Sequence, residues 1–141
     1  HRDPVAVIQS AMTMLAYGQR LNRHIVDIAG LASYWPDRIE HLLRRCVATR
    51  NGLPSSQSID VPFDVFMADD MGMVEKIYAK AGLELTTQAR AGMQQFIEEH
   101  PRGKHGQVQY SLKEDFGIDP ATLRERFRFY FDAFPVKAEA K

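Results

Sequence analysis

The sequence has a single cysteine, Cys46, among its 141 residues. One cysteine excludes an internal disulfide and suits a reducing compartment. Cys46 lies on an apolar helical stripe, which predicts a buried and inert thiol. No apolar run approaches the roughly 18 residues that a membrane-spanning helix needs, and no secretory signal is visible. We therefore predict a cytoplasmic protein without a membrane span.

Neither sign of charge is in excess, because the sequence has 18 Lys and Arg residues and 18 Asp and Glu residues. A duplex-binding domain shows a basic excess, so nucleic acid is disfavoured as a partner unless the cations gather on one face. The apolar fraction of 45% allows a real core, and the length suits one domain. The sequence does not begin with Met, and its first residues look like the end of a strand, so we expect a piece of a longer protein or a processed product.

Metal-binding and nucleophile patterns are also missing. The histidines show no ligand spacing with a partner in reach, so no metal site is predicted. No Gly-x-Ser-x-Gly sequence is present and no Cys–His pair is suggested. Gly103-Lys104 is not a phosphate-binding Walker loop, because Glu98 stands where its first glycine belongs and His105 where Ser or Thr belongs.

Two tripeptides look like the catalytic motifs of protein kinases, His1-Arg2-Asp3 and Asp115-Phe116-Gly117. A kinase needs an Asn five residues after the Asp, where this chain has Ile8. The two motifs would also lie close together in a kinase, and here almost the whole chain separates them. The kinase interpretation is therefore rejected.

What the sequence does have is helical periodicity over most of its length. We predict a mainly α fold of about six helices and one short strand, residues 59–63. The expected helices cover about 4–19, a run from Asn22 that Pro36 breaks or kinks before it continues to 50, 70–81, 87–100, a short turn after Ser111, and 120–134. Residues 137–141 are expected to fray. A single strand cannot satisfy its own hydrogen bonds, which predicts that the rest of a sheet lies upstream.

The opening residues combine a helix start with a cation. Asp3 is a good N-cap, and Pro4 suits the first helical position. Arg2 then stands beside the positive end of the helix dipole. Ser10 follows Asp3 by seven residues, on the same helix face and roughly 10 Å further along. The two side chains could grip one phosphate; the alternative is an ordinary cap with a solvated arginine.

A second cationic segment follows Pro101. Arg102, Lys104 and His105 are flanked by Gly103 and Gly106. Glycine lets backbone amides approach an anion closely. The alternative is a solvated basic loop.

Taken together, three segments resemble the carboxyl-terminal part of the PAPS-dependent sulfotransferase family, in particular its actinobacterial branch. Arg2-Asp3-Pro4 with Ser10 resembles the family's element that binds the 3′-phosphate of the nucleotide. The segment 59–69 resembles the piece that carries an aromatic residue near the adenine, with Phe63 in place of Tyr. The loop 102–106 resembles the Arg-Lys-Gly loop that closes over the 3′-phosphate, although its residue order differs. The cofactor-binding residues implied by this resemblance are Arg2, Ser10, Phe63, Arg102, Lys104, His105 and Gly106.

The resemblance implies an α/β, P-loop-like sulfotransferase fold whose parallel sheet is mostly missing here. Residues 1–141 would be its carboxyl-terminal, 3′-phosphate-anchoring part. The implied reaction moves a sulfuryl group from PAPS to a hydroxyl or amine of a small-molecule acceptor, without a metal. The catalytic residues and the phosphosulfate loop would lie in the missing amino-terminal part, so this piece alone should be inactive.

One alternative stays open at this point. The wide apolar stripes also suit a non-enzymatic helical module that binds another protein. Exposed core surface would further favour a homo-oligomer.

Overall fold

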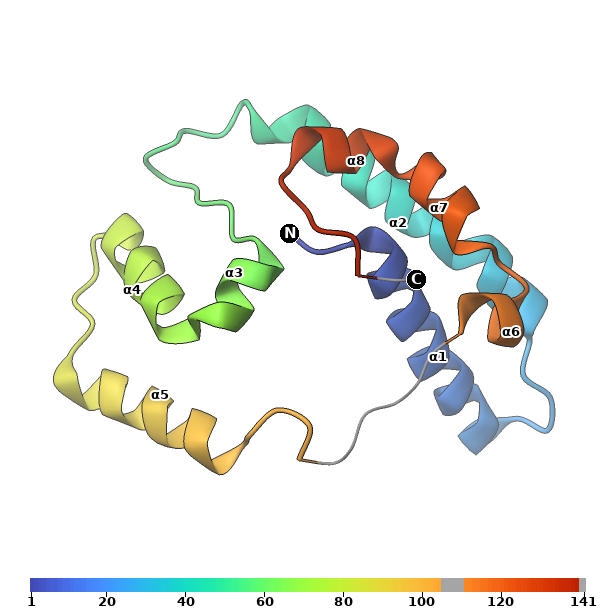
Figure 1. Ribbon diagram of the computed structural model, residues 1–141, viewed down its shortest axis with the longest axis horizontal. Helices are drawn as coiled ribbons and strands as arrows, with labels where there is room; N and C mark the ends of the chain where they lie inside the picture. Colours follow the sequence, from blue (N-terminus) through green and yellow to red (C-terminus); the bar gives the residue numbers. More distant parts are fainter. Residues whose placement is uncertain (105–110, 140–141) are drawn as a thin grey trace. The chain divides into compact units, whose positions relative to one another are not determined.

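Eight helices are found in the computed structural model, which describes residues 1–104 and 111–139 (Figure 1). They are α1 (Pro4–Asn22), α2 (Ile28–Arg50), α3 (Phe63–Ala68), α4 (Asp70–Ala81), α5 (Thr87–Glu99), α6 (Leu112–Phe116), α7 (Pro120–Arg126) and α8 (Arg128–Ala133). No strand occurs in these two ranges. The mainly helical fold agrees with the prediction.

The chain divides into two units. Unit 1 combines two stretches that are far apart in sequence, His1–Gly52 and Tyr110–Lys141. Unit 2 is the continuous stretch Leu53–Gln109 between them. Each unit is described below by itself.

The core of unit 1 forms where α1 packs against α2 and where the late helices return to both. α7 contacts α1, while α6 and α8 contact α2; Figure 1 shows α7 and α8 running along α2. Phe127, Ile8 and Met12 are completely buried there. The buried cluster consists of Val5, Ile8, Met12, Ala16, Leu31, Leu112, Phe116, Leu123 and Phe127. Residues from both ends of the chain thus share one core.

The boundary between α1 and α2 differs from the prediction. Asn22 ends α1 instead of capping the next helix, and Asp27 caps α2 by accepting a 2.8 Å hydrogen bond from the amide of Gly30. α2 also continues through Pro36, which is buried inside it. A proline in a helix interior costs about 3 kcal/mol, and we attribute its tolerance to the packing of α2 on α1, α6 and α8. Cys46 is only half-buried, so the expectation of a buried thiol is wrong.

An ion-pair network joins α7 to α2 on the surface of unit 1. Nε of Arg126 donates to Glu40 and Nη2 to Asp37, each at 2.5 Å. The other carboxylate oxygen of Glu40 accepts from Nε of Arg44 at 2.7 Å. The Arg44 guanidinium lies 4.1 Å from the ring centre of Phe129. Burial raises the pKa of Glu40, but the hydrogen bonds from Arg126 and Arg44 outweigh it and the net pKa is lowered.

The predicted starts of the later helices are confirmed. Asp69 caps α4 and Thr86 caps α5, each accepting from a backbone amide of the first turn. Ser111 caps α6 in the same way, and Asp119 with Pro120 begins α7. Short side chains with an acceptor oxygen therefore located these helices correctly.

The strand predicted at 59–63 is not formed. Residues 59–62 have no regular structure, and Phe63 is the first residue of α3. Pro62 does have extended dihedral angles, φ −65° and ψ 135°. An extended segment becomes a strand only when a neighbour completes its hydrogen-bond ladder, and the described residues provide none.

Unit 2 buries far fewer apolar side chains than unit 1. Among its described residues, Met73 is the only buried apolar side chain. An ion pair between Arg90 and Glu75 links α5 to α4. Large apolar residues such as Leu83 and Phe96 remain exposed, so unit 2 has apolar surface to cover.

Candidate functional site

The amino-terminal end of α1 is fixed by a buried carboxylate. Asp3 is completely buried, and its Oδ1 accepts a 2.8 Å hydrogen bond from the amide of Val5. Its Oδ2 accepts a 2.7 Å hydrogen bond from the amide of Glu139. A carboxylate is favourable at a helix N-terminus, where amides and dipole are both positive. The residue that precedes Asp3 therefore has a defined position.

That residue is Arg2, and it faces a carboxylate. Its Nε donates to Oε1 of Glu139 at 3.0 Å and its Nη2 donates to Oε2 at 2.8 Å. The pair is partly open to solvent, with 40% of the Arg2 side chain and 33% of the Glu139 side chain exposed. A planar guanidinium binds carboxylate and phosphate oxygens with the same two-pronged geometry. The structure thus places an anion-binding group beside the start of α1.

His1 completes the surroundings of this helix start. Its Nδ1 lies 2.7 Å from the hydroxyl of Tyr130. Its ring stacks on Phe134 with the ring centres 3.9 Å apart. The carboxyl-terminal helix α8 and the segment after it are therefore tied to the amino-terminal residues.

Ser10 lies two turns into α1 and is half-buried. The helical rise separates it from Asp3 by roughly 10 Å along the axis. Ser10 therefore lies within α1, whereas Arg2 precedes the N-cap of the same helix.

The other predicted site residues belong to unit 2. Phe63 begins α3 and is half-buried. Nη1 of Arg102 donates to the carbonyl of Met67 at 2.9 Å, and its Nη2 pairs with Asp70 at 3.1 Å. Nζ of Lys104 donates to the carbonyl of Glu99 at 3.1 Å. Both cations thus bond within unit 2. His105 and Gly106 lie outside the described residues.

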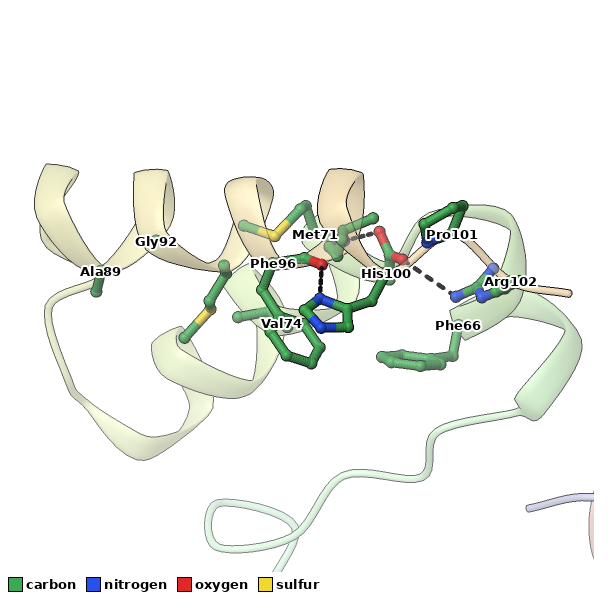
Figure 2. A pocket seen from close by; sticks show the side chains of 12 residues that line it. Phe66, Met71, Val74, Ala89, Gly92, Phe96, His100, Pro101 and Arg102 are labelled. Atoms are coloured by element: carbon green, nitrogen blue, oxygen red, sulfur yellow. Dashed lines mark hydrogen bonds and ion pairs between the residues drawn. The ribbon is translucent and has the colours of Figure 1, made fainter. Parts of the chain in front are cut away.

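Unit 2 also carries an apolar pocket of about 790 Å³. Figure 2 shows its side chains, which come from α3, α4, α5 and the residues after α5. The His100 ring stacks on Phe96 at 4.2 Å, and its Nδ1 lies 2.9 Å from the Phe96 carbonyl. Arg102 stands at one end of the pocket (Figure 2), and its ion-pair partner Asp70 also lines the pocket. Its lining residues are Phe66, Asp70, Met71, Val74, Ala89, Gly92, Met93, Phe96, Ile97, His100, Pro101 and Arg102.

Residues 1–104 and 111–139 contain no group of His, Cys, Asp and Glu side chains that could hold a metal ion. No helix within these ranges is long and apolar enough to cross a membrane.

One residue near the helix start was missed at the sequence level. Glu139 was placed in a terminal segment expected to fray, but both its amide and its carboxylate are bonded. No local pattern signals this contact, because its partners lie at the opposite end of the chain.

One comparison with known proteins identifies the family, and another supports the fold. A family profile described as the sulfotransferase family matches residues 1–87, which include Arg2, Ser10 and Phe63. The crystal structure of sulfotransferase STF9 from Mycobacterium avium matches with a TM-score of 0.83 and 22% identity. The match covers 100% of this chain and 36% of that one, so the chain spans about a third of its length. At this identity the match establishes the fold. No curated protein matches the chain.

Proposed function

Because this chain belongs to the sulfotransferase family, we propose that it anchors the 3′-phosphate and the adenine of PAPS. The single observation that carries the proposal is the start of α1. Arg2 stands outside a helix N-terminus whose geometry is fixed by the buried carboxylate of Asp3. The guanidinium fork, the dipole of the helix and the hydroxyl of Ser10 all suit a phosphate group.

Unit 2, taken by itself, carries the other residues that the family resemblance implies for nucleotide binding. In this proposal Phe63 stacks on the adenine, and Arg102, Lys104, His105 and Gly106 serve as 3′-phosphate-binding residues. Arg102 and Lys104 now bond to backbone carbonyls and to Asp70. A phosphate would replace the solvent-exposed bonds of these cations, which cost little to break.

The proposed reaction is transfer of a sulfuryl group from PAPS to a hydroxyl or amine of a small-molecule acceptor. Residues 1–141 form the carboxyl-terminal part of that domain. Positioning and electrostatics dominate such transfers, and the groups nearest the sulfur belong to the rest of the protein. This part alone is therefore inactive in our proposal and contributes nucleotide binding.

The test measures binding of two nucleotides to the complete protein by calorimetry. Adenosine 3′,5′-bisphosphate should bind much more tightly than 5′-AMP, which lacks the 3′-phosphate. Arg2→Ala should lower the affinity for adenosine 3′,5′-bisphosphate by about 10- to 150-fold, because a hydrogen bond to a charged group contributes about 1.5–3 kcal/mol. The affinity for 5′-AMP should stay unchanged.

The matched control is Arg20→Ala, which removes the same charge from the other end of α1. It should leave both affinities unchanged. Equal affinity of the wild-type protein for the two nucleotides would refute the proposal. An Arg2→Ala variant whose affinities for the two nucleotides fall by the same factor would also refute it.

The second candidate function is a non-enzymatic helical module that binds another protein. The apolar pocket of unit 2 and the exposure of Phe96 favour it. The same titration separates the two functions, since such a module has no preference for a 3′-phosphate.

A further inference from the structure

The segment that follows α8 returns to the start of α1. It is held at its beginning by Phe134, which is buried and stacks on His1. It is held again at Glu139, whose amide donates to Asp3 at 2.7 Å. We name residues 134–139 the carboxyl-terminal strap. Both of its ends are thus attached to the residues that precede α1.

The backbone anchor determines where the Glu139 carboxylate goes. The amide of Glu139 is bound to a completely buried carboxylate, and Arg2 is the residue next to that carboxylate in sequence. Little freedom remains between the anchored amide and the guanidinium. The bidentate pair, with bonds of 2.8 to 3.1 Å, is therefore built by the fold and is not a chance meeting of two long side chains.

A carboxylate in this position competes with a phosphate. Both anions bind the guanidinium through the same N–H groups in the same plane, and Glu139 accepts from both Nε and Nη2 of Arg2. Before a phosphate can take this geometry, the Glu139 side chain has to leave. Since the pair is partly exposed, the released carboxylate returns to water at small cost.

We propose that Glu139 is an internal anion that occupies Arg2 in the nucleotide-free protein and is displaced by the 3′-phosphate. This inference rests on the proposed function. The dianionic phosphate displaces the carboxylate, whereas a nucleotide without a 3′-phosphate leaves the pair intact. The strap therefore lowers the affinity for every ligand that needs Arg2 and leaves the affinity for other ligands unchanged.

The test uses the complete protein and compares wild type with Glu139→Gln, which keeps the size of the side chain and the backbone anchor. The variant should bind adenosine 3′,5′-bisphosphate about two- to fivefold more tightly, the range expected for releasing a partly exposed ion pair. Its affinity for 5′-AMP should not change. Glu125→Gln is the matched control, since it removes the same charge from the exposed pair with Arg128 in the same unit, and it should change neither affinity.

The Arg2→Ala background decides the mechanism. If Glu139 acts by occupying Arg2, Glu139→Gln has no effect on bisphosphate affinity once Arg2 is absent. An equal gain in both backgrounds would mean a general charge effect and would overturn the inference. Weaker binding by Glu139→Gln would also overturn it, because Glu139 would then orient Arg2 for the phosphate. If the wild-type protein does not prefer the bisphosphate, the proposed function is refuted. If it does prefer the bisphosphate and Glu139→Gln changes neither affinity, only the inference about Glu139 is refuted.

Discussion

Glu40 connects two arginines that come from different parts of unit 1. Its two carboxylate oxygens accept from Arg126 on α7 and from Arg44 on α2. The Glu40 side chain is only 19% exposed, so these bonds are stronger than typical surface pairs. We therefore expect Glu40→Gln to destabilise the protein measurably.

The magnitude follows from the two bonds. Hydrogen bonds to charged groups contribute about 1.5–3 kcal/mol when buried, whereas exposed ion pairs contribute about 0.2–1 kcal/mol. The Arg126 side chain is 34% exposed and the Arg44 side chain is 56% exposed. The contribution of this network to stability therefore lies between these limits. Gln has the same shape as Glu and keeps one acceptor oxygen, so no cavity is added. We expect Glu40→Gln to lower the free energy of unfolding by about 1–2 kcal/mol.

The effect depends on pH in a defined direction. The pKa of Glu40 in the folded protein lies below its ordinary value of 4.5. The folded state therefore binds fewer protons than the unfolded state in this range, and the stabilisation by Glu40 is complete above about pH 5. It is lost as the pH falls through the folded pKa. The stability difference between wild type and Glu40→Gln should be constant near neutral pH and should shrink in acid.

Urea unfolding followed by circular dichroism at neutral and acidic pH measures both effects. Glu125→Gln is the control, because its pair with Arg128 is about 70% exposed on both sides and should contribute no more than about 0.5 kcal/mol. Equal losses for Glu40→Gln and Glu125→Gln, or a difference that does not change in acid, would refute the reasoning.

Two further stability predictions use matched pairs and the same unfolding measurement. Phe127→Ala should cost about 3–5 kcal/mol, because Phe127 is fully buried between both halves of unit 1, whereas Phe96→Ala at a 62% exposed site should cost far less; similar costs would contradict the core assignment. Gly117→Ala should destabilise by about 1–2 kcal/mol, since Gly117 has φ 67° and a Cβ would meet no atom within 4 Å. Gly18→Ala, inside α1 and equally unobstructed, should instead stabilise by about 0.5–1 kcal/mol, so the same sign for both glycine variants would be inconsistent with the dihedral explanation.

Helix starts were the most predictable part of the fold. An N-cap is a local event between one side chain and an amide two or three residues later. The sequence offered Asp69 or Asp70 for α4, Thr86 or Thr87 for α5, and Asp119 for α7. The structure uses Asp69, Thr86 and Asp119. The helix start expected at Asn22 was wrong. Asp27, a few residues later, is the N-cap of α2, because its carboxylate accepts from the amide of Gly30.

The errors concern features that distant residues decide. Pro36 was expected to break or kink its helix, and the break does not occur, because α2 continues through Pro36 and packs on its neighbours. Residues 59–63 had the composition of a strand but no partner in the described chain. Local pattern cannot reveal such compensation, because it comes from segments elsewhere in the sequence.

The candidate site divides in the same way. The place of Ser10 two turns into α1 was predictable, because the helix start at Asp3 and Pro4 is a local signal; the phosphate-binding role of Arg2 and Ser10 stays a prediction. The contact of Glu139 with Arg2 was not predictable, since it joins opposite ends of the chain. The position of Phe63 at the start of a helix was also missed, because its segment was assigned to a strand.

Unit 1 is discontinuous in sequence, and this has a consequence for synthesis on the ribosome. α1 and α2 emerge before the rest of unit 1, and Leu123 and Phe127, which complete their core, follow only after all of Leu53–Gln109 has been made. At about 5–20 residues per second, that delay is on the order of seconds. During this interval Ile8 and Met12, which are completely buried in the finished unit, remain available to chaperones on the nascent chain.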